Sequence, residues 1–160
     1  ALPGLRPTPD AVRETLFNWL GQDLTGLACL DLFAGSGVLG IEAASRGATH
    51  VTLVERDART FAVLRDAAAA LGTDRLELVR ADAVKFLARA TRRYDLLFLD
   101  PPYRQGWIER VAPMLTGVLA ADARIYVEAE HSIESVGSWE TVRSGRTGQV
   151  YFHLLEALQA

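Results

Sequence analysis

Short apolar runs alternate with longer helical stretches along most of this 160-residue chain. Such runs predict strands that are buried on both faces, as the strands of parallel sheets are. The expected strands lie at residues 28–33, 50–54, 76–80, 94–99 and 124–130, and the expected helices at residues 38–46, 57–71, 83–90 and 106–119. This order is typical of βα units, so the sequence predicts an α/β fold with a mostly parallel sheet and helices on both faces.

The two ends of the chain depart from this alternation. Residues 5–20 predict an irregular lead-in followed by a helix, with Thr8 as its N-cap and Pro9 at the first helical position. Residues 140–144 and 149–155 predict a hairpin whose strands are separated by a four-residue loop. We therefore expect the sheet to finish with antiparallel strands.

Composition limits the classes of protein to which the chain can belong. No linker or repeat divides it, so we expect one domain over residues 1–160, with an N-terminal segment and helix (1–26) before a core (27–160). The net charge of −3 and the pI near 5.6 argue against a protein that coats nucleic acid through a large basic face. The sequence has no signal peptide and no apolar run of membrane-spanning length, so we expect a cytoplasmic protein.

The cysteine and histidine residues do not indicate a metal site. Cys29 lies in an expected strand, where it should be a small buried hydrophobe in a reducing compartment. The three histidines lie in or beside expected strands without metal-ligand spacing, and they are His50, His131 and His153. We therefore expect no metal.

Acidic residues lie at or near the carboxyl ends of four successive expected strands, and they are Asp31, Glu55, Asp82 and Asp100. In open parallel sheets ligands bind beyond these strand ends. The four acids therefore predict a cleft that is rich in hydrogen-bond acceptors. Such a cleft suits a ligand that carries ammonium, hydroxyl and amine donors.

The glycine turn after Asp31 fits G-x-G-x-x-G at residues 35–40, and Glu55 lies near the spacing of a ribose-binding acid, so a nicotinamide dinucleotide must be weighed. Against it, Asp31 would place negative charge beside a turn that should receive a pyrophosphate. S-adenosylmethionine has no phosphate, and it carries a sulfonium and an ammonium. The pattern therefore favours this methyl donor, with Glu55 on its ribose hydroxyls and Asp82 on its adenine amine.

The Asp-Pro-Pro-Tyr segment (residues 100–103) follows the expected strand 94–99 directly. Proline cannot donate to a sheet ladder and holds the preceding residue extended, so Asp100 should stand at the strand end with its carboxylate in a defined direction. A fixed acceptor, carbonyls without competing N–H groups and the Tyr103 ring suit the recognition of an exocyclic amine on a nucleobase. A strand followed by a simple Pro-Pro turn is the alternative interpretation.

The glycine turn (31–37), Glu55, Asp82 and the Asp-Pro-Pro-Tyr segment together resemble the class I methyltransferases that modify exocyclic amines. More closely, residues 5–20 and 31–37 resemble the bacterial RsmD family of 16S rRNA guanine-N2 methyltransferases. The resemblance covers essentially the whole chain. It implies a Rossmann-like fold, S-adenosylmethionine as cofactor, and a monomer acting on 16S rRNA, either free or within a 30S particle. Family members usually carry a basic, glycine-rich segment before the Arg-Pro-Thr stretch, and its absence here fits a truncated N-terminus.

Three groups of site residues follow from the motifs and this resemblance. The expected catalytic residues are Asp100, Pro101, Pro102 and Tyr103. The expected cofactor-binding residues are Asp31, Phe33, Ala34, Gly35, Gly37, Glu55, Arg56, Asp82, Ala83 and Asp100. The expected substrate-binding residues are Arg6, Thr8, Arg13, Tyr103, Arg104 and Trp107.

Other functions remain open from the sequence. An adenine-N6 or other base-amine methyltransferase, acting on DNA or another RNA, would use the same Asp-Pro-Pro-Tyr segment. From different classes, the alternatives are a nicotinamide-dependent oxidoreductase and a non-catalytic RNA-binding module that keeps the fold.

Overall fold

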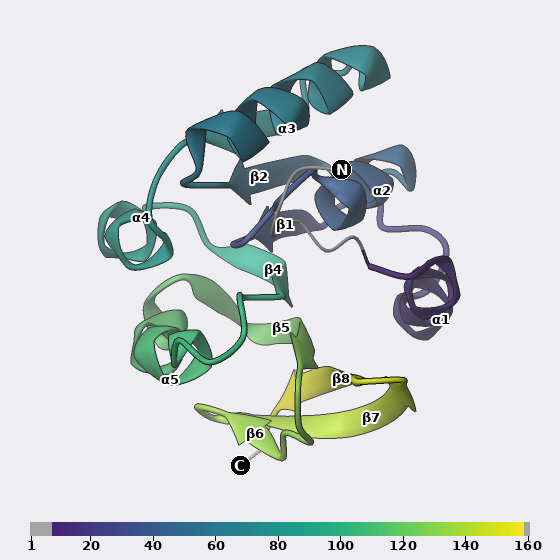
Figure 1. The fold of residues 1–160 in the computed structure, drawn as a ribbon, viewed down its shortest axis with the longest axis vertical. Helices are drawn as coiled ribbons and strands as arrows, with labels where there is room; N and C mark the ends of the chain where they lie inside the picture. The colour runs from purple at the N-terminus through teal and green to yellow at the C-terminus, as the bar shows by residue number, and fades with distance from the viewer. Residues whose placement is uncertain (1–7, 159–160) are drawn as a thin grey trace.

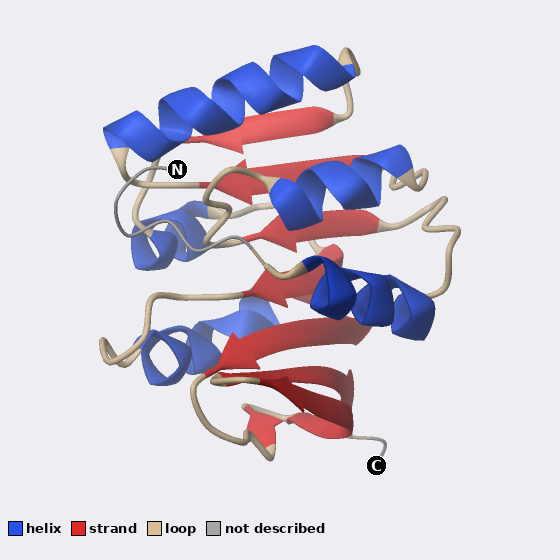
Figure 2. Ribbon diagram, turned by 45° about the vertical axis from the view of Figure 1, so that its right-hand side comes forward, coloured by secondary structure: helices blue, strands red, loops and turns tan. Residues whose placement is uncertain are grey.

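The computed structural model describes residues 8–158, which form one eight-stranded sheet with helices on both faces (Figures 1 and 2). The strands are β1 (Ala28–Asp31), β2 (His50–Val54), β3 (Leu76–Val79), β4 (Tyr94–Leu99), β5 (Leu119–Ala129), β6 (Ser135–Val136), β7 (Trp139–Thr147) and β8 (Val150–Ala157). Their order across the sheet is β3-β2-β1-β4-β5-β8-β7-β6. Strands β1 to β5 are parallel, and β8, β7 and β6 extend the sheet with antiparallel pairing, as the sequence predicts.

The helices divide between the two faces of the sheet (Figure 2). They are α1 (Asp10–Leu20), α2 (Val38–Ser45), α3 (Ala58–Leu71), α4 (Ala83–Arg89) and α5 (Trp107–Val111), followed by the 3₁₀ helix η1 (Ala112–Gly117). Helices α1, α2 and α3 pack in one hydrophobic core, while α4, α5 and η1 pack in a second core on the opposite face. Both faces of β1, β2 and β4 are therefore mostly buried, which explains their largely apolar runs, while the edge strand β3 is only half-buried.

The strand order reverses at β1, which lies between β2 and β4. The chain leaves β1 toward one edge of the sheet and later crosses to β4 on the other side. In open parallel sheets, the crevice at the carboxyl ends of strands flanking such a switch point is where ligands bind. The topology therefore selects the ends of β1, β2 and β4 as the place for a site.

Several element boundaries differ from the sequence predictions. Thr8 was expected to cap the first helix, but Pro9 occupies the N-cap position and the Thr8 hydroxyl donates to Glu128 Oε2 over 2.9 Å. The expected helix 106–119 is a short α-helix followed by 3₁₀ turns, because Pro113 has no N–H and its ring disfavours a continuing α-helix.

The terminal hairpin is also tighter than predicted. Strand β7 continues through Thr147, which pairs with Val150, so the turn contains only Gly148 and Gln149. Gly148 has φ of 59°, a conformation that glycine adopts without steric cost. The two-residue strand β6 was not predicted, because so short a segment shows no periodicity of its own.

Candidate functional site

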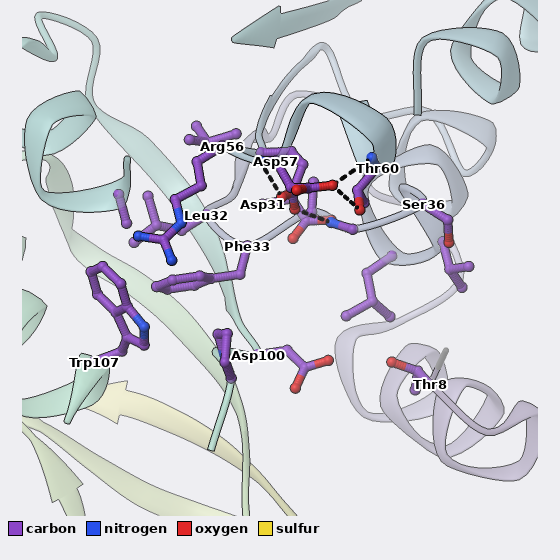
Figure 3. Close-up of a pocket in the computed structure, with 18 of the residues that line it drawn as sticks. Thr8, Asp31, Leu32, Phe33, Ser36, Arg56, Asp57, Thr60, Asp100 and Trp107 are labelled. Carbon is purple, nitrogen blue, oxygen red and sulfur yellow. Dashed lines mark hydrogen bonds between the residues drawn. The ribbon is translucent and has the colours of Figure 1, made fainter. Parts of the chain in front are cut away.

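A cavity of about 500 Å³ opens at the carboxyl ends of β1, β2 and β4 (Figure 3). Its volume lies in the range of sites for small molecules and cofactors. The residues that line it are Thr8, Asp31, Leu32, Phe33, Ala34, Gly35, Ser36, Val38, Leu39, Val54, Glu55, Arg56, Asp57, Thr60, Ala81, Ala83, Asp100, Pro102, Tyr103 and Trp107. The cavity thus unites the glycine turn, the end of β2 and most of the Asp-Pro-Pro-Tyr segment.

Asp31 is the buried acid of this cavity, with only 2% of its surface exposed. Burial raises its pKa to about 7, and the negative charges of Glu55 and Glu128 act in the same direction. The Gly40 N–H opposes this shift by donating to Asp31 Oδ2 over 3.1 Å. Asp31 therefore changes its charge near neutral pH, and a cationic ligand beside it would favour the ionised form.

Two glycines allow close packing around the start of helix α2, Gly40 against the sheet and Gly37 against α3. A Cβ on Gly40 would lie 2.7 Å from Leu53 Cδ2 and 3.2 Å from Asp31 Oδ2. A Cβ on Gly37 would lie 2.5 Å from Leu64 Cδ1, and Gly37 has φ of 91°. Gly37 does not line the cavity, so its requirement is one of backbone conformation and packing.

Glu55 connects two turns through backbone amides. Its Oε1 accepts from Gly35 N–H over 3.0 Å, and its Oε2 accepts from Asp57 N–H over 2.9 Å. Each carboxylate oxygen can accept more than one hydrogen bond, so these contacts leave Glu55 able to bind hydroxyl groups of a ligand. Asp57 in turn caps α3 by accepting from the Thr60 N–H and hydroxyl.

Asp82 caps the helix that follows it. Its Oδ2 accepts from the amides of Val84 and Lys85, so it caps helix α4. Asp82 does not line the cavity, whereas its neighbours Ala81 and Ala83 do. Arg56 Nη1 lies 3.9 Å from Asp82 Oδ1 and connects the ends of β2 and β3.

An aromatic wall closes one side of the cavity. The rings of Phe33 and Trp107 meet edge to face with centroids 5.3 Å apart. The guanidinium groups of Arg110 and Arg56 lie 3.9 Å and 5.8 Å from the Trp107 ring centroid. In Figure 3 these rings and Arg56 lie on one side, while Asp100 and Thr8 lie toward the other. The two rings give this side of the cavity an apolar, aromatic character.

The Asp-Pro-Pro-Tyr segment separates this cavity from a smaller one of about 150 Å³. Pro102 and Tyr103 line both cavities, whereas Pro101 and Arg104 line only the smaller one. Arg104 has φ of 65°, which is unusual for a residue with a side chain, and its Nε lies 3.7 Å from Glu130 Oε2. The segment is therefore accessible from two sides.

The remaining predicted residues are Arg6, Thr8 and Arg13, and of these only Thr8 lines the large cavity in the described structure. Arg13 forms an ion pair with Asp10 over 3.0 Å and lies 3.9 Å from Glu42, and it does not line the cavity. Arg6 lies outside the described residues. Thr8, two residues before the start of α1, does line the cavity.

Sequence reasoning missed one acid at this edge of the sheet. Glu128, in β5, is 4% exposed and accepts hydrogen bonds on Oε2 from the hydroxyls of Thr8 and Tyr126, each over 2.9 Å. The sequence does carry a signal, since Glu128 interrupts an apolar strand near its carboxyl end. It resembles in this respect the four acids that were predicted.

Three further observations concern metal binding, membrane helices and the cysteine in the described residues. The part of the chain that the structure describes holds no cluster of three or more His, Cys, Asp and Glu side chains that could bind a metal ion. Over residues 8–158, no helix has both the length and the apolar character needed to cross a membrane. Burial raises the pKa of the Cys29 thiol to about 12, so this cysteine is not a reactive thiolate.

Comparison with known proteins points to one family. The sequence model described as conserved hypothetical protein 95 matches residues 1–156. The chain is 42% identical over 159 residues to ribosomal RNA small subunit methyltransferase D of Escherichia coli K12, covering 96% of this chain and 80% of that protein. A solved structure of Escherichia coli yhhF is 41% identical, with a TM-score of 0.87, over 98% of this chain and 90% of that one.

A more distant likeness shows the fold alone. The structure of an RNA methyltransferase from Salinibacter ruber in complex with S-adenosyl-L-homocysteine has a TM-score of 0.77 at 17% identity. It covers 97% of this chain and 95% of that one.

Proposed function

This chain belongs to the RsmD family of ribosomal RNA methyltransferases, and on that premise we propose that it methylates the exocyclic N2 amine of a guanine in 16S rRNA, with S-adenosylmethionine as donor. One observation carries the proposal. A single cavity is lined both by the glycine turn with its acids and by the Asp-Pro-Pro-Tyr segment. A methyl donor and an amine acceptor can therefore meet at one sheet edge.

The chemistry of the lining residues fits S-adenosylmethionine. When bound, this cofactor supplies a methyl group made electrophilic by its sulfonium. Asp31 offers a carboxylate to the ammonium group, and Glu55 offers its acceptor capacity to the ribose hydroxyls. The Phe33 and Trp107 wall, with Ala83 nearby, provides an apolar surface for the adenine ring. Asp82 contributes by capping α4 and so holding Ala83 in place.

The same acids argue against a nicotinamide dinucleotide. Asp31 is buried directly beneath the glycine turn, through its bond with the Gly40 N–H, and Glu55 already holds the Gly35 amide. A pyrophosphate would need such amides and would meet two carboxylates there. A ligand with positive charge and hydroxyl donors avoids this repulsion.

The Asp-Pro-Pro-Tyr segment would overcome the low reactivity of the amine. The N2 lone pair of guanine is delocalised into the ring, so it must be redirected toward the methyl carbon. Asp100 and the Pro101 carbonyl would accept the two N–H hydrogens and orient the lone pair along the methyl–sulfur bond. Bound S-adenosylmethionine would supply the methyl group and leave as S-adenosylhomocysteine, while Asp100 or water would take the N2 proton that is released.

The target base must leave its stack to reach this position. Tyr103 follows the two prolines and lines both cavities, so its ring can stack on an extruded base. The Arg104 side chain, which is 87% exposed, lies at the same edge, where it can contact the RNA backbone, whereas the buried Thr8 donates its hydroxyl to Glu128. The acidic pI suggests that a 30S particle, which offers contacts beyond phosphate charge, is a better substrate than free rRNA.

Nucleoside analysis tests the proposal. The protein is incubated with S-adenosylmethionine and either naked 16S rRNA or 30S particles that lack the modification, and the digested RNA is examined by mass spectrometry. We expect N2-methylguanosine, with more product from the particle. N6-methyladenosine would instead favour the alternative base-amine reaction, and no methylated nucleoside from either substrate would favour a binding module. Equal yields from both substrates would contradict the preference for the particle.

A further inference from the structure

Glu128 is a buried acid beside the catalytic segment that the mechanism above does not use. Strands β4 and β5 are parallel, and Leu99 at the end of β4 pairs with Val127 of β5. Asp100 directly follows Leu99, and Glu128 directly follows Val127. Both therefore lie at the same edge of the sheet. Glu128 also lines the smaller cavity together with Pro101, Pro102 and Tyr103, so it borders the space beside the segment expected to hold the amine.

Two hydroxyl groups hold the Glu128 carboxylate in one orientation. Thr8 Oγ1 and the Tyr126 hydroxyl each donate to Oε2 over 2.9 Å. Burial, together with the negative charge of Glu128, raises the pKa of Tyr126, so its hydroxyl stays protonated as a donor. A carboxylate has about four acceptor positions, so these two bonds are compatible with a further donor from a ligand.

Asp100 and Pro101 alone would not determine which base is methylated. Both accept hydrogens from an exocyclic amine, and guanine N2 and adenine N6 present the same two hydrogens. The two bases differ at the adjacent ring nitrogen, because guanine N1 carries a hydrogen whereas adenine N1 is an acceptor. A carboxylate beside N1 would accept a hydrogen bond from guanine N1–H, but it would repel the lone pair of adenine N1.

We propose that Glu128 accepts the N1–H of the target guanine and so selects guanine over adenine, an inference that rests on the proposed function. Sites built to bind a specific hydrogen-bonding group reject analogues that lack it far more strongly than apolar pockets reject a change of size. Accepting N1–H also shifts electron density toward C2 and its amine. Glu128 is thus a specificity residue that favours the nucleophile as well.

The variant Glu128→Gln tests this role without removing the bonds to Thr8 and Tyr126, because the Gln carbonyl can accept both. Its amide can instead turn an N–H toward the base. The substrate is ribosomal RNA carrying either guanine or 2-aminopurine at the methylated position. 2-Aminopurine keeps the reacting amine, but its N1 is an acceptor. We expect the wild type to prefer guanine by at least about tenfold in kcat/KM, and Glu128→Gln to reduce that ratio by at least about tenfold.

The controls separate this role from a structural one. Glu140→Gln, on the exposed face of β7, should leave both rates within about twofold of wild type. The affinity of Glu128→Gln for S-adenosylhomocysteine should also stay within about twofold. If Glu128→Gln lowers kcat/KM equally for the guanine and 2-aminopurine substrates, the assignment is wrong. It is also wrong if the wild type has equal kcat/KM for both. If the wild type forms no N2-methylguanosine at all, the proposed function fails instead.

Discussion

The backbone N–H of Gly35 donates to Glu55 Oε1 over 3.0 Å, across twenty positions of sequence. The second oxygen of Glu55 accepts from Asp57 N–H, so one carboxylate fixes both the turn after β1 and the turn before α3. An acid in this position organises the backbone of the cavity before any ligand binds. The proposed ribose-binding role of Glu55 therefore depends on the same carboxylate that holds these two turns.

The variant Glu55→Gln should weaken cofactor binding. A Gln side chain presents one acceptor and one donor, so its NH₂ group would face the N–H of either Gly35 or Asp57. Hydrogen bonds to charged groups contribute about 1.5–3 kcal/mol, so we expect the Kd for S-adenosylhomocysteine to rise about 10- to 100-fold. Isothermal titration calorimetry measures this change. The exposed variant Glu14→Gln on α1 is the matched control, and an unchanged Kd for Glu55→Gln would contradict the ribose-binding role.

Asp100→Ala should abolish methyl transfer while largely preserving cofactor binding. Removing a single group that stabilises developing charge lowers kcat by about 10²–10³-fold in other enzymes, and Asp100 also orients the amine. Single-turnover assays with labelled S-adenosylmethionine measure the rate, and calorimetry checks binding. Asp122→Asn, an exposed acid on β5, is the control for charge alone. Turnover near the wild-type value in Asp100→Ala would remove Asp100 from the mechanism.

The raised pKa of Asp31 predicts how stability depends on pH. The pKa is 3.8 in the unfolded chain and about 7 in the folded protein, so between these values the folded state binds a proton that the unfolded state has lost. The contribution of Asp31 to the free energy of unfolding of the ligand-free protein should therefore fall as the pH rises between these two values, and it should level off above about 7. Urea unfolding at several pH values measures it, and Asp31→Asn should remove this part of the dependence. Identical pH profiles for the two proteins would contradict the assignment.

Gly40→Ala should destabilise the protein because its Cβ would lie 2.7 Å from Leu53 Cδ2, in a fully buried contact. Overpacking of this kind costs about 1–3 kcal/mol, partly offset by the better helix propensity of alanine. Chemical denaturation measures the change. Gly117→Ala is the control, because a Cβ there has no neighbour within 4 Å among the described residues. Equal effects of the two variants would show that close packing at Gly40 is unimportant.

Local signals were enough to predict most of the parallel sheet. Strands β2 and β4 begin and end where their mostly apolar runs do, because both are buried on both faces. Asp100 could be placed at a strand end because proline stops a ladder. Predictions failed where contacts distant in sequence decide the outcome, as at Thr8, which bonds to Glu128 rather than capping its own helix.

The sequence by itself determined the class of fold, the glycine turn and the four acids at strand ends, because periodicity, proline and glycine act through the local backbone. Only the tertiary structure decided which acids meet. It turned Asp82 toward its own helix, placed Phe33 against Trp107, and brought Glu128 beside Asp100 through the parallel register of β4 and β5. Strand order and register are set by the packing of both cores together, and no local stretch of sequence carries that information.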